Sequence, residues 1–216
     1  MFQKKTKLPV RASINGVDIR NINHFHDHGD GFMLWEADVY IDNKKIAFFQ
    51  QDSWGGPDRL EFLPGFKMND SEEQIQQVKK EQDKNQKTLK ERSDNYFSKH
   101  PQKIKMLDQI IEMESPSDFL YRVYTLNNWL KVAKKHAKND KEVIITFPDN
   151  DGIPLNNERF YSIDTKSISN KETFENLLQH LAEKEKIDRD KTVVLSSPED
   201  FKVNTTSEPD HGCIDR

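Results

Sequence analysis

A two-residue alternation near the N-terminus constrains the fold more than any other feature of the chain. From Met33 to Ile41 the odd-numbered positions are apolar, and Glu36 and Asp38 lie between them. Because side chains alternate between the two faces of a strand, this spacing predicts a strand with one apolar face. The Asp-Asn-Lys-Lys sequence at residues 42–45 is typical of a turn, and Ile46–Gln50 predicts the returning strand. The stretch therefore predicts an antiparallel hairpin.

The hairpin is expected to belong to a small antiparallel sheet within residues 1–68. Val17–Ile22 has the same alternation and predicts a strand before the hairpin. The polar stretch His24–Gly31 then predicts a histidine-rich loop, whose two glycines allow backbone angles that larger residues avoid. After a polar loop that ends in Gly-Gly-Pro at residues 55–57, Leu60–Leu63 predicts a short fourth strand.

Residues 69–140 are expected to be helical. Ser71 and Gln74 form a capping-box pattern, which predicts a polar helix that continues to about Lys99. Pro101 suits the first turn of a second helix, because its missing N–H group has no intrahelical partner there. A third helix is expected to follow a cap at residues 115–118 and to end near residue 139. The predicted buried stripe of the second helix consists of Ile104, Leu107, Ile110 and Ile111.

Residues 141–202 predict a small α/β region. Its order is strand, strand, helix and strand, placed at Val143–Phe147, Arg159–Ile163, the stretch after Asn170, and Thr192–Leu195. Residues 203–216 are polar and are expected to form a flexible tail. The chain as a whole predicts an α+β fold with a small antiparallel N-terminal sheet, central helices and a C-terminal small α/β segment.

Composition and charge exclude several classes of protein. Charged residues make up 32% of the chain and hydrophobic residues 34%, against typical values of about 25% and about 45–50%. The formal net charge of −4 is too small to indicate a nucleic-acid-binding protein, so an electrostatic partner would have to meet a local patch. Cys213 is the single cysteine, which excludes an intramolecular disulfide and a multi-cysteine zinc site.

The sequence also lacks the patterns of exported proteins and of large enzyme families. Its basic start has no apolar core of signal-peptide length, and no stretch approaches the roughly 20 apolar residues of a membrane span. We therefore expect a cytoplasmic protein that does not enter a membrane. A glycine-rich phosphate loop, a Ser-His-Asp order at a strand-to-helix elbow and a His-Glu-x-x-His helix are all absent from the sequence.

Alternate histidines in the predicted loop suggest a metal site. His24, His26 and His28 are spaced two residues apart, so in an extended segment their imidazoles project to one side. With an oxygen from Asp30, such a set suits Zn²⁺ or Mn²⁺. Two alternatives stay open: a polar loop in which the histidines satisfy turn backbone groups, and direct use of a histidine in acid–base chemistry.

Two other patterns predict contacts with a partner. Four lysines lie three or four residues apart on one face of the predicted third helix, where they suit phosphates or an acidic protein surface. Lysines near a helix C-terminus also interact favourably with the helix dipole and need no partner. Tyr40 and Trp54 are aromatic groups suited to a binding surface, although Trp54 can equally fold back over the sheet. The four lysines are Lys131, Lys134, Lys135 and Lys138.

The hairpin and the loop after it resemble a module of phage and plasmid proteins. Glu36–Ala47, followed by the Asp-x-Trp-Gly-Gly sequence at residues 52–56, is similar to a strand, turn, return strand and glycine loop that recur in uncharacterised accessory proteins of such elements. The resemblance covers Glu36–Gly56. It implies a mobile-element context and carries no catalytic residues.

We therefore expect an interaction protein of a mobile genetic element that inhibits or modifies a host defence machine by surface contact, as anti-CRISPR proteins do. The expected partner is a host protein or ribonucleoprotein, and direct contact with nucleic acid is a further option. The alternative is a metal-dependent hydrolase or nuclease, in which an ion held by the cluster from His24 to Asp30 activates water.

Overall fold

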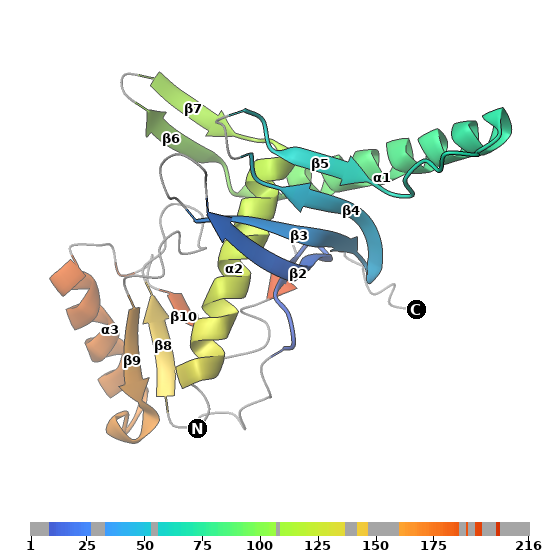
Figure 1. Cartoon of the computed structure of the whole chain (residues 1–216). Helices are drawn as coiled ribbons and strands as arrows, with labels where there is room; N and C mark the ends of the chain where they lie inside the picture. Colours follow the sequence, from blue (N-terminus) through green and yellow to red (C-terminus); the bar gives the residue numbers. More distant parts are fainter. Residues whose placement is uncertain are drawn as a thin grey trace, which may run out of the picture.

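The fold of the chain is α+β, with a large antiparallel sheet, two long helices and a smaller sheet covered by a third helix (Figure 1). The computed structural model describes residues 9–26, 33–52, 56–106, 109–136, 142–146, 160–185, 189, 193–195 and 202–203. Within these residues, no helix is both long enough and apolar enough to cross a membrane.

The N-terminal sheet contains six strands in the order β11-β1-β2-β3-β4-β5, and all neighbours are antiparallel except β1 and β11. The predicted hairpin is confirmed, because β3 and β4 pair along their length. Its turn residues Asp42 and Asn43 both have positive φ, 48° and 69°, which is the backbone of a tight hairpin turn. The strands are β1 (Ser13–Ile14), β2 (Val17–His26), β3 (Met33–Ile41), β4 (Lys44–Gln50), β5 (Arg59–Phe62) and β11 (Lys202–Val203).

The prediction that a loop begins at His24 is wrong, because β2 continues to His26. A bulge between Arg20 and Asn23 interrupts the pairing with β3, and Asn21 within it has a φ of 54°. After the bulge the register resumes and runs to the pair His26–Met33. The extra residue of the bulge shifts the alternation of apolar and polar side chains by one position. The sequence pattern therefore does not indicate that the strand continues.

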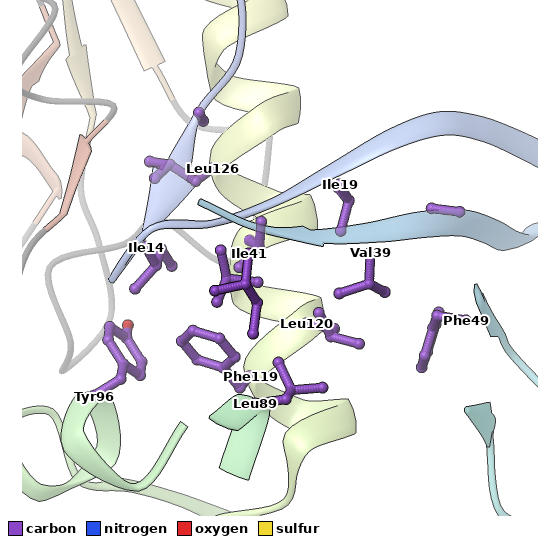
Figure 2. Close-up of a cluster of buried hydrophobic side chains, with 14 of the residues drawn as sticks. Ile14, Ile19, Val39, Ile41, Phe49, Leu89, Tyr96, Phe119, Leu120 and Leu126 are labelled. Carbon is purple, nitrogen blue, oxygen red and sulfur yellow. The ribbon is translucent and has the colours of Figure 1, made fainter. Parts of the chain in front are cut away.

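Helix α2 (Pro116–His136) covers one face of this sheet (Figure 1). Its cap is built by Ser115 and Asp118, each of which accepts a hydrogen bond from the backbone N–H of the other. Figure 2 shows Phe119, Leu120 and Leu126 facing sheet residues in one apolar core. The labelled sheet residues there are Ile14, Ile19, Val39, Ile41 and Phe49, all of them buried.

A buried asparagine fixes α2 to the chain before β1. The Oδ1 atom of Asn127 accepts a hydrogen bond from the backbone N–H of Ala12 at 3.2 Å. Its Nδ2 group donates to the carbonyl of Val123 at 2.9 Å. Both Ala12 and Asn127 are buried, so these bonds satisfy groups that water does not reach.

Helix α1 (Glu72–Lys99) begins at the predicted capping box, in which Ser71 and Gln74 each bond the backbone of the other. Its buried residues lie from Asn85 onward, and Leu89 and Tyr96 join the core shown in Figure 2. Its first turns extend away from the sheet (Figure 1). Asn85 donates to the carbonyl of Leu63 at 2.7 Å and so ties the helix to the end of β5.

The predicted second helix is wrong. Beyond Pro101 the structure has a hairpin, with β6 (Gln102–Met106) paired to β7 (Gln109–Met113). Ile104 is paired with Ile111, two residues that the sequence analysis assigned to one stripe of a helix. Periodicity does not distinguish the two structures over so short a run, and β-branched isoleucines favour strands. The region 69–140 therefore holds two helices with a hairpin between them.

The C-terminal α/β segment is confirmed in order and composition. Strands β8 (Glu142–Thr146), β9 (Phe160–Asp164) and β10 (Val193–Leu195) form an antiparallel sheet in the order β10-β8-β9. Helix α3 (Lys171–Glu185) is capped by the predicted Asn170, whose Oδ1 accepts from the N–H of Thr173 at 2.8 Å. Val203, which we expected to begin the tail, pairs with Ile14 in the large sheet. Residues 204–216 lie outside the described residues.

This second sheet lies between α2 and α3. In β8, Ile144 belongs to the α2 core, and its neighbour Ile145 packs with Leu178 and Leu181 of α3. The ring of Phe160 in β9 meets the edge of Trp129 in α2 at a centroid distance of 5.9 Å. Helix α2 is therefore shared by both sheets.

Replacing Asn127 with Ala is expected to lower the free energy of unfolding by about 1–3 kcal/mol, because the buried N–H of Ala12 loses its acceptor. Urea denaturation followed by circular dichroism measures the change. Asn128→Ala is the matched control, since Asn128 is only half-buried on the same helix. Equal losses of stability in the two variants would contradict the assigned role of Asn127.

Candidate functional site

Two predicted site loops leave the large sheet at the same end. The first follows His26, which pairs with Met33 at the end of the β2–β3 ladder. The second follows Gln51, whose backbone N–H donates to the carbonyl of Trp35 at 3.1 Å. The Gln51 side chain completes the link, because its Oε1 accepts from the N–H of Trp35 at 2.9 Å. We call the surface formed by His24, His26, Met33 and Tyr124 the contact edge.

A rigid aromatic group supports the contact edge from beneath. The ring of Tyr124 stacks on the buried indole of Trp35, with centroids 4.4 Å apart and planes 7° from parallel. The centroid of the Trp35 ring also lies 4.5 Å from that of Phe49 and 5.7 Å from that of Tyr121, with which it makes a T-shaped contact. The hydroxyl of Tyr124 lies 2.9 Å from Nε2 of His24. The ring of His24 is therefore held by a side chain that is itself fixed by stacking.

Beyond His24 the same face of the sheet is exposed. In an unbroken register, His24 and His26 occupy alternate positions on β2, opposite Trp35 and Met33 on β3. All four side chains therefore share the α2-facing side of the sheet. Trp35 is buried beneath α2, whereas the side chains of His24 and His26 are exposed and Met33 is 63% exposed. The sheet extends past the part that α2 covers.

Tyr121 and Gln51 join the aromatic group to the second loop. The Gln51 amide donates a hydrogen bond to the hydroxyl of Tyr121. Burial raises the pKa of Tyr121 to about 12, and the charge of Asp58 acts in the same direction. At neutral pH the phenol is therefore protonated and uncharged.

Three carboxylates lie near the start of α2. Asp58 accepts a hydrogen bond from the backbone N–H of Asp52 at 3.2 Å, and Asp52 accepts one from the N–H of Gly56 at 2.5 Å. These bonds connect Asp52 to Gly56 and to Asp58. Burial raises the pKa of Asp58 above its usual value, and the negative charges of Asp118 and Asp52 raise it further.

Tyr40, a predicted contact residue, lies on the opposite face of the sheet. Its ring is covered by the guanidinium of Arg20, 3.7 Å from the ring centroid. Arg20 is held there by Asp18, at 2.7 Å and 3.0 Å, and by Asn43 at 2.8 Å. The hydrogen bond and the charge of Asp18 raise the pKa of Arg20. Tyr40 therefore serves in a cation–π contact within the sheet face.

The predicted lysine face is not uniform. Lys131 and Lys135 are exposed, as expected for a binding surface. Lys134 is half-buried, and its Nζ donates to the carbonyl of Val10 at 2.8 Å. Burial lowers the pKa of this ammonium group. The structure thus gives Lys134 a structural contact and leaves two of the lysines open to solvent.

Several predicted site residues lie outside the described residues, namely His28, Asp30, Trp54 and Lys138. The part of the chain that the structure describes contains no group of three or more metal-ligating side chains. The four-residue metal cluster is therefore still a prediction, of which the structure places two members, His24 and His26, on one strand face.

Sequence reasoning did not identify Tyr121, Tyr124, Gln51 or Asp58 as site residues. The two tyrosines are three residues apart on α2, a spacing that brings side chains to one helix face. This spacing was the feature of the sequence that could have indicated that they act together. Their distance in sequence from His24 and Trp35 concealed the contact.

Comparison with protein-family models, curated proteins and solved structures finds no match for the chain.

Replacing Asp58 with Asn is expected to increase stability at pH 7 and to change it little at pH 3. The pKa of Asp58 is raised in the folded state by burial, so stability falls as pH rises from the ordinary carboxyl pKa to the folded value, and the full loss is present at pH 7. At pH 3 the wild-type carboxyl is protonated in both states and resembles the amide. Chemical denaturation at the two pH values measures the difference. Asp94→Asn, at an exposed ion pair on α1, should show no such gain at pH 7.

Proposed function

We propose that the chain is an interaction protein that captures a macromolecular partner at the contact edge. One observation carries this proposal: Met33, His24 and His26 are exposed together at the end of a sheet, next to the buried rings of Trp35 and Phe49. Exposed apolar side chains that adjoin aromatic groups are typical of binding surfaces.

The rigidity of the contact edge supports this function. Tyr124 is stacked on Trp35, and Trp35 is bonded through its backbone to both the backbone and the side chain of Gln51. A surface that is already ordered loses little conformational entropy when a partner binds. The surface suits a protein partner because Met33 and Tyr124 present apolar area, and His24 and His26 add polar groups at its margin.

The proposed partner is a host protein or ribonucleoprotein of the cytoplasm, and the proposed setting is a phage or plasmid whose product inhibits or modifies a host defence machine. The resemblance of Glu36–Gly56 to accessory proteins of such elements supports the setting. Lys131 and Lys135 supply two exposed cations elsewhere on the surface, suited to an acidic or phosphate-bearing part of the same partner.

Replacing Met33 with Asp is expected to abolish capture of the specific partner from a host lysate, because a charge is placed at the centre of the contact edge. Immobilised protein followed by mass spectrometry of bound protein and nucleic acid provides the measurement. Val10→Asp is the matched control, since Val10 is 79% exposed but lies next to Lys134 rather than at the contact edge. Identical partner sets for wild type and both variants would contradict the proposal.

A metal-dependent hydrolase is the second candidate, and it is favoured by the placement of His24 and His26 on one exposed face of β2. An ion held there would be open to solvent and to a substrate. Wild-type protein with Zn²⁺ or Mn²⁺ is then expected to cleave single-stranded DNA or RNA, and His26→Ala is expected to lose this activity. Absence of metal-stimulated cleavage on both nucleic acids would exclude the nuclease form of this function.

A further inference from the structure

We infer that His24 and His26 form a Zn²⁺-binding site on β2, in which Tyr124 orients the ring of His24. The site rests on the second candidate function, since the same two histidines would hold its ion. Its test is separate from partner capture and from cleavage, because metal affinity is measured on the isolated chain. The inference depends on three features of the described residues: the strand positions of the two histidines, the Tyr124 hydrogen bond, and the exposure of the site.

The strand brings the two imidazoles to one side. The register from Asn23 to His26 is continuous, so His24 and His26 are two residues apart in a regular strand. Their Cα atoms are then separated by roughly 6.5–7 Å, since a strand advances about 3.3 Å per residue. Two imidazoles that start from such a spacing can converge on one ion at metal–nitrogen distances of about 2.0–2.1 Å.

Tyr124 engages one ring nitrogen of His24, Nε2, and leaves the other, Nδ1, without this contact. Its hydroxyl lies 2.9 Å from Nε2 of His24 and can accept a hydrogen bond from Nε2–H. That tautomer leaves the lone pair on Nδ1 for the metal. A ring nitrogen bonded to an outer partner in this way is the usual arrangement for a metal-binding histidine. The stacking of Tyr124 on Trp35 keeps the hydroxyl in position.

His26 is the adaptable member of the pair. Its side chain is exposed, and among the described residues no hydrogen bond engages either of its ring nitrogens. The side chain can therefore rotate towards His24 without breaking a hydrogen bond to the described residues.

The donor set favours zinc over manganese. Two neutral imidazoles provide nitrogen donors and no negative charge, and imidazole suits zinc, whereas manganese prefers carboxylates and water. Glu36 does not supply a nearby oxygen, because it pairs with Asn23 and projects from the opposite face of the sheet. The stability order of divalent ions likewise places Mn²⁺ below Zn²⁺ for a given site.

Titration calorimetry of the full chain with ZnCl₂ and with MnCl₂ tests the site. Wild type is expected to bind Zn²⁺ more tightly than Mn²⁺, and His26→Ala or His24→Ala is expected to weaken Zn²⁺ binding at least tenfold. Tyr124→Phe keeps the aromatic ring that stacks on Trp35 but removes the hydroxyl, and it should weaken binding by about 10–100-fold. The control His180→Ala removes an exposed histidine on α3 and should leave the affinity unchanged.

Separate measurements test the site itself, the role of the Tyr124 hydroxyl and the choice of metal. Wild-type Zn²⁺ affinity in His26→Ala, an exposed position at which folding is not at risk, would overturn the site. Wild-type affinity in Tyr124→Phe would overturn the positioning role of the hydroxyl. Equal or tighter binding of Mn²⁺ would overturn the assignment of a nitrogen-only donor set.

Discussion

The packing of α2 between two sheets is the interaction on which the rest of the structure depends. Its residues Phe119, Leu120 and Leu126 close the core of the large sheet, while Trp129 packs against β9 of the small one. A hydrophobic helix shared in this way supplies buried area to both layers of a chain that has comparatively few apolar residues. Asn127 adds a directional contact to this packing, because its side chain accepts a hydrogen bond from the buried backbone N–H of Ala12.

The contact edge exists because the sheet is longer than the area that α2 covers. Along β3, Trp35 is buried under the helix, and Met33, one position further on the same face, is exposed. At this boundary Tyr124 contacts the sheet through Trp35 and through His24. The same geometry therefore produces a rigid support and an open surface, which is the combination that a binding site or an exposed metal site requires.

Features that depend on residues close together in the sequence were predicted correctly. Features that depend on pairing between more distant residues were not. The hairpin of residues 33–50 and the capping box at Ser71 depend on neighbours in sequence, and both are confirmed. The extension of β2 to His26 depends on pairing with β3 across a bulge, which no local pattern reveals. The stretch after Pro101 contains too few residues for its period to separate helix from strand, and pairing of Ile104 with Ile111 decided the outcome.

The sequence by itself determined the fold class, the apolar face of β3, the helix caps and the presence of histidines at the end of β2. The tertiary structure alone decided that His24 meets Tyr124, that Tyr40 lies beneath Arg20, and that Lys134 binds the carbonyl of Val10. The physical reason is the same in each case. Hydrophobic patterning specifies which face of an element is buried, but the partner on that face is chosen by packing between elements far apart in the chain.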